Sequence, residues 1–426
     1  MYVSRAKIEN LKIVSSFDLE LTRDEAPGWH VILGDNGAGK STIIRAVAVA
    51  LIGRENAAAL RQNWSSWLGE NNSSGSIALT IRADPDLDRW VEKGKQSNKP
   101  IRPRVSFSRI QTQDSIYPEF SGDYTRRTVW GGGNGWFSAA FGPFRRFRGG
   151  DRDYEKLYYS HPRLAAHLSA FGEDVALSEA LEWIKTIQFR ALENDASATA
   201  LTQSLVKFIN ASELLPHGAE IDEITSSGVM MTDGANAVIP VEEMSDGYRS
   251  ILAMTFELLR AMETAFGTQQ LLQSLNSDNG TVNLPGVILI DEIDAHLHPA
   301  WQKRIGTWFV SRFPRAQFFV TTHSPIICQA AVHGSIWRLA SPGSAENSGR
   351  VKGQDLDRLL YGNVLEAYST EHFGADVTRS PESQEMLVTL ARINRKSLSE
   401  DLTEKEQEQR LELQRRLPST ANNFTE

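Results

Sequence analysis

The sequence predicts an α/β fold in which a mainly parallel sheet is covered by helices on both faces. Two segments, 285–294 and 316–325, contain continuously apolar runs of strand length, which is typical of strands buried on both faces. Helical patterns such as 300–313 alternate with these strands. A glycine-rich loop, "GDNGAGKST", lies between a predicted strand and a predicted helix, as phosphate-binding loops of α/β proteins do.

The first 160 residues predict mostly strands around one buried helix. Alternating apolar and polar residues at 4–12 and 15–22 predict an antiparallel meander that leads into a buried strand at 30–34. The small, apolar and β-branched residues after the glycine-rich loop predict a buried helix that ends near Gly53. Beyond this helix we expect a β-rich insertion, with strand patterns at 76–83, 104–110 and 136–141.

From about residue 161 to 214 the pattern is helical, with apolar residues three and four apart over 177–194 and 198–215. No heptad pattern is sustained, so we expect a lobe and not a long coiled coil. In the charged tail, Thr403 and Glu406 predict a capping box ahead of a short helix. We interpret this helix as a solvated terminal element, with a partner-binding element as the alternative.

The composition is that of a soluble globular protein, with 41% hydrophobic and 23% charged residues among 426 and a formal net charge of −8. The single cysteine, Cys328, excludes a disulfide framework and a multi-cysteine zinc site within the chain, and it favours a cytoplasmic location. No apolar run approaches the roughly 20 residues that cross a bilayer, and the first residues lack the layout of a signal peptide. We therefore expect no membrane association.

A local basic patch lies between Ser121 and Arg152 despite the acidic total charge. Six arginines and two aspartates occur there among six tryptophans and phenylalanines. This mixture suits contacts to phosphates and bases, an arginine-lined nucleotide site, or a partly buried sheet edge. Candidate contacts to DNA or nucleotide are Arg145, Arg146 and Arg148.

The glycine-rich loop matches the pattern G-x-x-x-x-G-K-[ST] of phosphate loops. Its glycines allow backbone N–H groups to point at phosphates, Lys40 is expected to reach the β and γ oxygens, and Ser41 is expected to bind Mg²⁺. The sequence therefore predicts a site for ATP and Mg²⁺. Its nucleotide-binding residues are expected to be Gly34, Asn36, Gly37, Gly39, Lys40, Ser41 and Thr42.

Acidic residues follow the apolar run at 287–290, where the carboxyl end of a core strand lies beside the phosphate loop. We expect Asp291 to hold Mg²⁺ through water and Glu292 to act as the general base for the attacking water. His323 ends the next buried strand, where an imidazole could detect a γ-phosphate through a hydrogen bond. His296 and His298 offer an alternative metal site, but no third ligand accompanies them at a characteristic spacing.

The segment "MSDGYRS", at 244–250, precedes an apolar helix and allows two interpretations. Ser245 can cap this helix by accepting a hydrogen bond from a free N–H group in the first turn. The same helix N-terminus can also bind a phosphate.

These motifs, at 34–41, 244–250, 287–299 and 321–325, resemble in their order the ABC-type ATPase heads of the SMC and RecF group. The resemblance implies that Ser245 and Gly247 belong to the signature loop, that Asp294 lies in the D-loop and that His323 is the switch histidine. In that group the signature loop of one subunit contacts ATP bound by another, which implies a homodimer or a higher homo-oligomer. The Q-loop glutamine is not securely placed, with Gln111 and Gln113 as candidates.

Segments 176–194, 245–262 and 402–418 also resemble a compact subgroup of this family, the stand-alone ATPases of anti-phage systems such as Septu PtuA and some retrons. That resemblance implies a Mg²⁺-dependent ATPase that regulates a separate HNH nuclease and carries no nuclease motif itself. The alternative is a RecF- or SMC-like DNA-repair ATPase that binds DNA directly. A transport motor is disfavoured, because no feature indicates a membrane partner.

The resemblance implies an ABC-type head with a mixed or parallel P-loop sheet, antiparallel N-terminal strands and a helical lobe between phosphate loop and signature. The expected parts are an N-terminal ATPase lobe with the β-rich insertion, a helical lobe, a C-terminal ATPase lobe and a C-terminal helical extension. They occupy residues 1–160, 161–235, 236–345 and 346–426.

Overall fold

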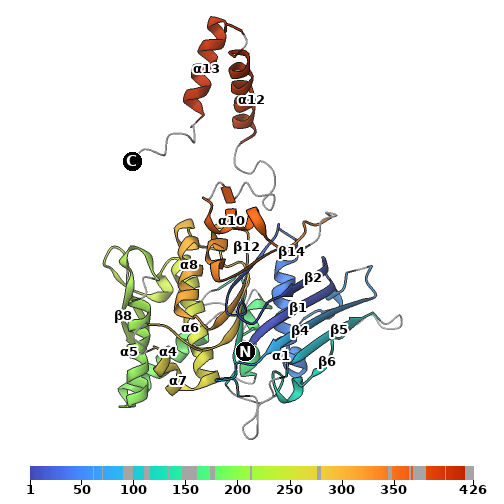
Figure 1. Ribbon diagram of the computed structural model, residues 1–426. Helices are drawn as coiled ribbons and strands as arrows, with labels where there is room; N and C mark the ends of the chain where they lie inside the picture. Colours follow the sequence, from blue (N-terminus) through green and yellow to red (C-terminus); the bar gives the residue numbers. More distant parts are fainter. Residues whose placement is uncertain are drawn as a thin grey trace. The chain divides into compact units, whose positions relative to one another are not determined.

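Helix α1 (Lys40–Ala59) lies between two sheets and is buried on nearly all sides, as its almost uniformly apolar sequence requires. Figure 1 shows the computed structural model, in which the chain divides into two units, Met1–Gly362 and Asn363–Glu426. The structure describes residues 1–60, 62–69, 71–89, 99–109, 116–131, 135–145, 161–172, 178–211, 214–275, 280–343, 348–363, 366–367, 380–398 and 400–417.

One face of α1 packs on a mainly parallel sheet. Its strand order is β14-β13-β3-β12-β11-β7, and all neighbours run parallel except β13 and β14. Every residue of the strands β3, β12, β11 and β7 is buried, which explains their continuous apolar runs. The strands are β3 (Gly28–Leu33), β7 (Ser138–Phe141), β11 (Gly286–Ile290), β12 (Ala316–Thr322), β13 (Gly334–Arg338) and β14 (Gly349–Arg350).

The second sheet is antiparallel, with the order β2-β1-β4-β5-β6. The strands β4, β5 and β6 of the expected β-rich insertion therefore do not form a separate lobe, because β4 pairs directly with β1 and extends the N-terminal meander. The third predicted strand of the insertion, β7, belongs to the parallel sheet instead. The antiparallel strands are β1 (Tyr2–Leu11), β2 (Val14–Glu20), β4 (Ser74–Arg82), β5 (Arg102–Ser108) and β6 (Glu119–Asp123).

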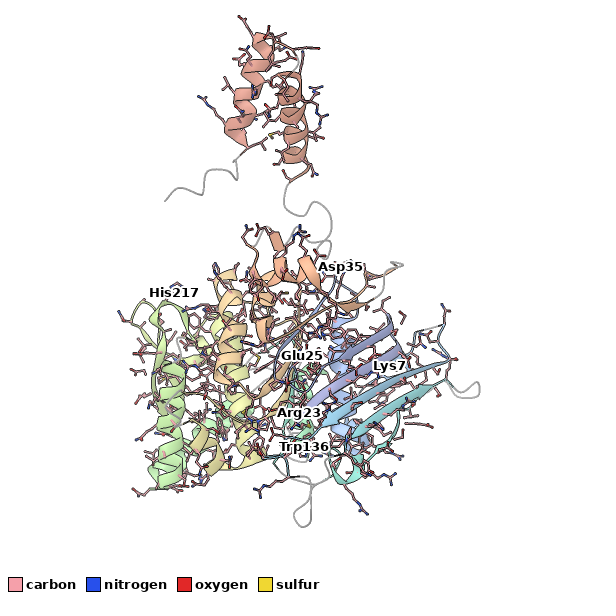
Figure 2. The ribbon with its side chains drawn as sticks, in the orientation of Figure 1. Lys7, Arg23, Glu25, Asp35, Trp136 and His217 are labelled. Atoms are coloured by element: carbon pink, nitrogen blue, oxygen red, sulfur yellow. The ribbon has the colours of Figure 1, made fainter. Side chains whose placement is uncertain are left out.

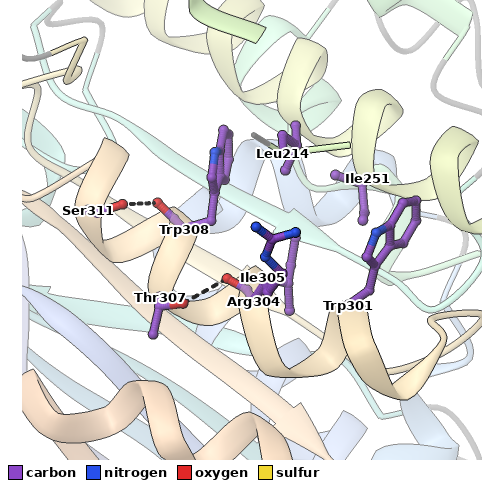
Figure 3. Close-up of a pocket in the computed structure, with 8 residues that line it drawn as sticks. All are labelled: Leu214, Ile251, Trp301, Arg304, Ile305, Thr307, Trp308 and Ser311. Carbon is purple, nitrogen blue, oxygen red and sulfur yellow. Dashed lines mark hydrogen bonds between the residues drawn. The ribbon is translucent and has the colours of Figure 1, made fainter. Parts of the chain in front are cut away.

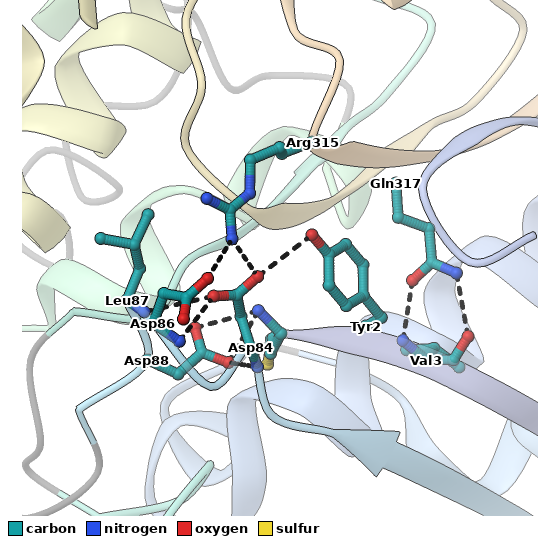
Figure 4. A network of polar contacts seen from close by, with 9 residues as sticks. Tyr2, Val3, Asp84, Asp86, Leu87, Asp88, Arg315 and Gln317 are labelled. Atoms are coloured by element: carbon teal, nitrogen blue, oxygen red, sulfur yellow. Dashed lines mark hydrogen bonds and ion pairs between the residues drawn. The ribbon is translucent and has the colours of Figure 1, made fainter. Parts of the chain in front are cut away.

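Polar side chains join the two sheets at one end (Figure 4). The amide of Gln317, at the start of β12, makes two hydrogen bonds to the backbone of Val3, at 2.7 and 2.9 Å. Arg315 forms an ion pair of 2.6 Å with Asp84, which follows β4 and also accepts a hydrogen bond from Tyr2. These contacts fix β12, which leads to the candidate site, relative to the antiparallel sheet.

The opposite face of the parallel sheet packs against α8 (Pro299–Arg312), where Phe309 stacks on Trp29 of β3 and packs on Phe318 of β12. The parallel sheet is thus covered on both faces, and the predicted α/β class is confirmed. Short helices α9 (Pro325–Cys328) and α10 (Gly353–Tyr361) follow β12 and β14, and α3 (Pro162–Ala165) contacts α1.

A helical lobe lies between the phosphate loop and residues 244–250, which are called the signature segment after the role that the resemblance implies for them. Helices α4 (Ser178–Leu192) and α5 (Ala196–Asn210) pack on each other and on α6 (Asp246–Phe266) and α7 (Thr268–Leu275), respectively. A three-stranded antiparallel sheet that the sequence did not predict adjoins them. It consists of β8 (Glu220–Thr225), β9 (Gly228–Thr232) and β10 (Val238–Pro240).

The second unit contains a pair of helices, α12 (Pro381–Lys396) and α13 (Glu404–Arg416). The predicted capping box is present, because Thr403 accepts from the Glu406 N–H and the Glu406 side chain accepts from the Thr403 N–H. Lys396 and Glu406 join the two helices through an ion pair of 2.7 Å. Among the described residues, no helix is both long and apolar enough to cross a membrane.

Candidate nucleotide-binding site

Three loops meet at the carboxyl edge of the parallel sheet, following β3, β11 and β12. The register pairs Leu33 of β3 with Thr322 of β12 and Val320 of β12 with Ile290 of β11, so the three strands end side by side. Because the carboxyl ends of parallel strands form the usual ligand site of α/β proteins, the loops after them define the candidate site.

The phosphate loop lies between β3 and α1. Gly37 and Gly39 have φ values of 80° and 98°, and a Cβ atom at Gly39 would lie 2.5 Å from Val14 Cγ2, so glycine is required there. Ser41 is half-buried and Thr42 is buried in the first turn of α1. Asp35 is exposed at the position marked in Figure 2, and its carboxylate accepts a hydrogen bond of 2.6 Å from Ser341.

Lys40 is buried within this loop. Its Nζ donates to the carbonyls of Gly34 and Asp35, at 2.7 and 3.0 Å. Desolvation lowers the Lys40 pKa, while the nearby carboxylates, Glu292 foremost, oppose that shift. The ammonium group is thus held at the loop, where a phosphate would offer a stronger acceptor than two neutral carbonyls.

Asp291 and Glu292 follow β11, and Thr321 of β12 holds both. The Thr321 hydroxyl donates to Asp291 Oδ1 at 2.6 Å and accepts from the Glu292 N–H at 2.8 Å. Asp291 is buried, whereas Glu292 is only partly buried and has a left-handed backbone with φ of 47°. The donor set fits the predicted metal, because the Asp291 carboxylate and the Ser41 hydroxyl are the oxygen ligands that Mg²⁺ prefers.

Asp294 and His323 complete the cluster. Thr322, the last residue of β12, donates to Asp294 Oδ1 at 2.5 Å. His323 Nδ1 lies 3.3 Å from Lys40 Nζ. Burial and the Lys40 charge hold the His323 pKa below its ordinary value, which favours a neutral imidazole that accepts from the lysine.

The structure corrects the expectation that Arg145 contacts DNA. Its side chain is 4% exposed, and its guanidinium group donates only to groups inside the protein. An arginine in an aromatic, glycine-containing segment after β7 cannot be told from a surface arginine by composition alone. Arg146 and Arg148, like the Q-loop candidates Gln111 and Gln113, lie outside the described residues.

The signature segment occupies the start of α6. Ser245 is the N-cap residue by its backbone, with φ of −62° and ψ of 158°, but its exposed side chain makes no capping hydrogen bond. Gly247 lies against the loop after β11 and against α8, because a Cβ atom there would be 3.2 Å from the His296 carbonyl and 2.9 Å from Trp301. Tyr248 packs edge-on against the Trp301 ring, with 4.8 Å between centroids. The interpretation of Ser245 as a side-chain cap of this helix is therefore not supported.

A pocket of about 290 Å³ is lined mainly by α8, together with Ile251 of α6 and Leu214 (Figure 3). None of its lining residues belongs to the phosphate loop or to the loop after β11, so it is separate from the candidate site. Its walls are Leu214, Ile251, Trp301, Arg304, Ile305, Thr307, Trp308 and Ser311.

The alternative metal site at His296 and His298 finds no support in the described part of the chain. His298 Nδ1 accepts a hydrogen bond of 3.3 Å from the Ala300 N–H and so caps α8. No group of three or more His, Cys, Asp or Glu side chains suited to a metal ion occurs among the residues that the structure describes.

A family model described as "AAA domain, putative AbiEii toxin, Type IV TA system" matches residues 30–329. The chain belongs to this family, AAA_21. The matched region contains every residue of the candidate site, from the phosphate loop to His323. The AAA_21 assignment thus covers the three loops whose geometry is described above.

Individual relatives confirm the resemblance to Septu and retron proteins. The chain is 23% identical over 416 residues to the Septu protein PtuA of Bacillus thuringiensis, a match that covers 95% of this chain and 91% of that protein. It is 22% identical over 344 residues to the Septu protein PtuA of Bacillus mycoides (strain KBAB4), which covers 79% of this chain and 40% of that protein. With the Retron Ec83 probable ATPase of Escherichia coli it shares 37% identity over 110 residues, covering 26% of this chain and 19% of that protein. The chain thus spans less than half the length of two of these three relatives.

Among solved structures, an SMC head bound to the C-winged helix domain of ScpA matches with a TM-score of 0.47 and 15% identity. The match covers 82% of this chain and 97% of that chain. An SMC head domain from Thermotoga maritima matches with a TM-score of 0.42 and 14% identity, over 83% and 100% of the two chains.

Proposed function

We propose that the chain binds ATP with Mg²⁺ and hydrolyses it to ADP and phosphate. The observation that carries this proposal is the convergence of Lys40, Asp291 and Glu292 at one edge of the sheet, with Lys40 bonded to the phosphate loop and to His323. Membership of the AAA_21 family supports it.

Each residue of the cluster has a distinct role in this proposal. Lys40 and the loop N–H groups bind the β- and γ-phosphates, and Ser41 and Asp291 hold Mg²⁺, which neutralises phosphate charge when bound. Glu292 accepts a proton from the attacking water, since its carboxylate is partly exposed next to the buried Asp291. His323 contacts the γ-phosphate with a neutral imidazole, and Asp294 lies beside it in the D-loop.

We further propose that ATP joins two copies of the chain head to head. Ser245 and Gly247 of one copy would face the phosphate held by Lys40 of the other. The exposed Ser245 hydroxyl, which is not used as a helix cap, supports this arrangement. A helix N-terminus with free N–H groups is a suitable partner for a γ-phosphate.

For biological context we propose that this ATPase regulates a separate nuclease, of the HNH class, in anti-phage defence. The similarity to Septu PtuA over 95% of this chain supports the proposal. The alternative, direct DNA binding in repair, loses one of its three candidate arginines, because Arg145 is buried. Co-purification of the chain from its native operon, followed by mass measurement, tests both: a nuclease in the complex supports regulation, and a DNA-only complex supports repair.

Two substitutions test the ATPase proposal. Lys40→Ala should weaken ATP binding by about 100-fold, because it removes the cation that faces the phosphates. Glu292→Gln should retain ATP binding but slow turnover by about 100-fold, because the amide cannot accept the proton. Nucleotide binding is measured with a fluorescent ATP analogue and turnover by phosphate release.

The matched controls are Lys303→Ala and Glu193→Gln, two exposed positions away from the three loops, which should leave both properties unchanged. Wild-type protein that binds no ATP in the presence of Mg²⁺, or Glu292→Gln protein with normal turnover, would show that the proposal is wrong.

A further inference from the structure

The buried guanidinium group of Arg145 joins three segments that are far apart in the chain. Its Nε donates to Ser250 Oγ of α6 at 3.0 Å. The other four N–H groups donate to backbone carbonyls of the loop after β7 and of the turn after β11. These carbonyls belong to Gly142 (3.0 Å), Asp291 (2.9 Å), Glu292 (3.0 Å) and Ile293 (3.4 Å).

The hydrogen bonds from Arg145 to the turn after β11 hold a backbone conformation that is unfavourable by itself. Glu292 has a left-handed φ of 47°, a conformation that a non-glycine residue keeps only when its surroundings hold it. Thr321 binds the Glu292 N–H on one side, and Arg145 binds the Glu292 carbonyl on the other. Together these two contacts fix the peptide groups on both sides of the Glu292 Cα atom, and so the direction of its Cα–Cβ bond.

The bond to Ser250 links this turn to the signature segment. Ser250 is buried in α6, little more than one helical turn after Ser245, so the two residues move as parts of one rigid helix. A shift of α6 that follows a contact at Ser245 would therefore move Ser250 and pull on the guanidinium group. A charged, planar group with five donors is suited to this task, because the three donors of a lysine could not serve Ser250 and four carbonyls at once.

We infer that Arg145 is a positioning residue that couples the signature helix α6 to the general base Glu292. This inference rests on the proposed ATPase function and adds to it a path by which contact at the signature loop reaches the hydrolytic residue. The carboxylates of Asp291, Asp294 and Glu292 keep the guanidinium charged, although desolvation lowers the Arg145 pKa to about 10. The bonds are therefore charge-assisted at neutral pH.

The test compares Arg145→Met with Ser250→Ala in the full-length chain. Arg145→Met removes all five donors but retains an unbranched apolar side chain, and Ser250→Ala removes only the bond to α6. We expect Arg145→Met to lower kcat by about 30-fold with the Kd for ATP changed less than about threefold, because Lys40 and its loop are untouched. Ser250→Ala should lower kcat by about fivefold.

The double variant should have the kcat of Arg145→Met alone, because Ser250 acts through Arg145. Arg163→Met is the matched control: Arg163 also donates to a backbone carbonyl, that of Val129, and packs over Trp136, but it lies away from the three loops. A purely structural role predicts that both arginine variants lower the melting temperature and leave kcat per folded molecule unchanged.

A folded Arg145→Met variant with wild-type kcat would overturn the inference, as would additive losses in the double variant. If Arg145→Met does not fold, Ser250→Ala decides, and an unchanged kcat in that variant overturns the coupling. Failure of the proposed function would give a different result. In that case the wild type would show no ATP turnover, or the Glu292→Gln variant would turn over ATP at the wild-type rate.

Discussion

At the scale of single residues, the candidate site depends on side chains that hold the acidic residues in place. Thr321 is the clearest case, because one hydroxyl both donates to Asp291 and accepts from the Glu292 backbone. The Thr322 hydroxyl likewise donates a hydrogen bond to the Asp294 carboxylate. The two adjacent threonines at the end of β12 thus orient three carboxylate-bearing residues on the neighbouring loop.

Replacing Thr321 by valine keeps the shape of the side chain and removes both hydrogen bonds. We expect Thr321→Val to lower kcat by about 10- to 100-fold and to raise the Mg²⁺ concentration needed for activity, because Asp291 loses its fixed orientation. Steady-state ATPase assays over a Mg²⁺ titration measure both effects. Thr321→Ser retains the hydroxyl and should keep most of the activity, so equal rates in the two variants would contradict the proposed role.

The sequence identified most of this site because its residues lie in short motifs with a fixed relation to strand ends. Lys40 could be placed in the loop that follows one predicted strand, and Asp291 and His323 at the ends of two others, and the ends of parallel strands share one edge. Arg145 could not be assigned in this way, because all of its partners except the Gly142 carbonyl lie more than 100 residues away. No local pattern encodes such contacts.

At the scale of elements, helix α1 shows how one glycine bends a buried helix. The predicted helix end near Gly53 corresponds to a kink, where Gly53 has φ of 78° and ψ of −179° before helical structure resumes up to Ala59. Trp130 lies against this kink and donates from Nε1 to the Ala50 carbonyl at 2.9 Å. The tryptophan thus caps the first part of α1, whose N-terminus carries Lys40 and Ser41.

Gly53→Ala should destabilise the protein by about 3 kcal/mol, because this backbone region is nearly exclusive to glycine and the new methyl group would meet Trp130. A Cβ atom at Gly53 would lie only 2.5 Å from the indole Cδ1. Gly267→Ala is the matched control, since Gly267 also has a positive φ, of 87°, but its Cβ position has no described residue within 4 Å apart from its chain neighbours. Denaturant unfolding should show a clearly smaller loss for Gly267→Ala, and equal losses would mean that the Trp130 contact is unimportant.

Elements whose partners lie far away in sequence were harder to predict. The strand patterns of β4, β5 and β7 were visible, but nothing local indicates that β4 pairs with β1 while β7 joins β11. The sheet of β8, β9 and β10 was missed, because β8 and β10 are short and largely polar or exposed. Buried parallel strands, by contrast, can be predicted locally, because their continuous apolar runs indicate burial on both faces.

At the scale of the whole molecule, the proposed contact between two copies of the chain concerns the signature segment. Its outward residue, Ser245, is exposed, while its inward residues rest on other elements, with Gly247 and Tyr248 against Trp301 and Ser250 against Arg145. A segment with a rigid inner face and an exposed helix N-terminus can transmit a contact made at Ser245 to the interior. The division of the chain into four parts stays a prediction. Its bounds are 1–160, 161–235, 236–345 and 346–426.

Ser245→Arg tests whether that contact is a second copy of the chain. The bulky cation should leave ATP binding by Lys40 within about threefold of wild type, because the monomer's own phosphate loop is unchanged, but it should block ATP-driven dimerisation and lower turnover at least about tenfold. The comparison uses the Glu292→Gln background, in which bound ATP is retained, with mass measured by light scattering with and without ATP. Ser226→Arg places the same cation at an exposed serine in the turn between β8 and β9 and should dimerise normally. If Ser245→Arg protein also forms ATP-dependent dimers, the exposed serine is not part of the interface, and the signature segment would have to act within one copy of the chain.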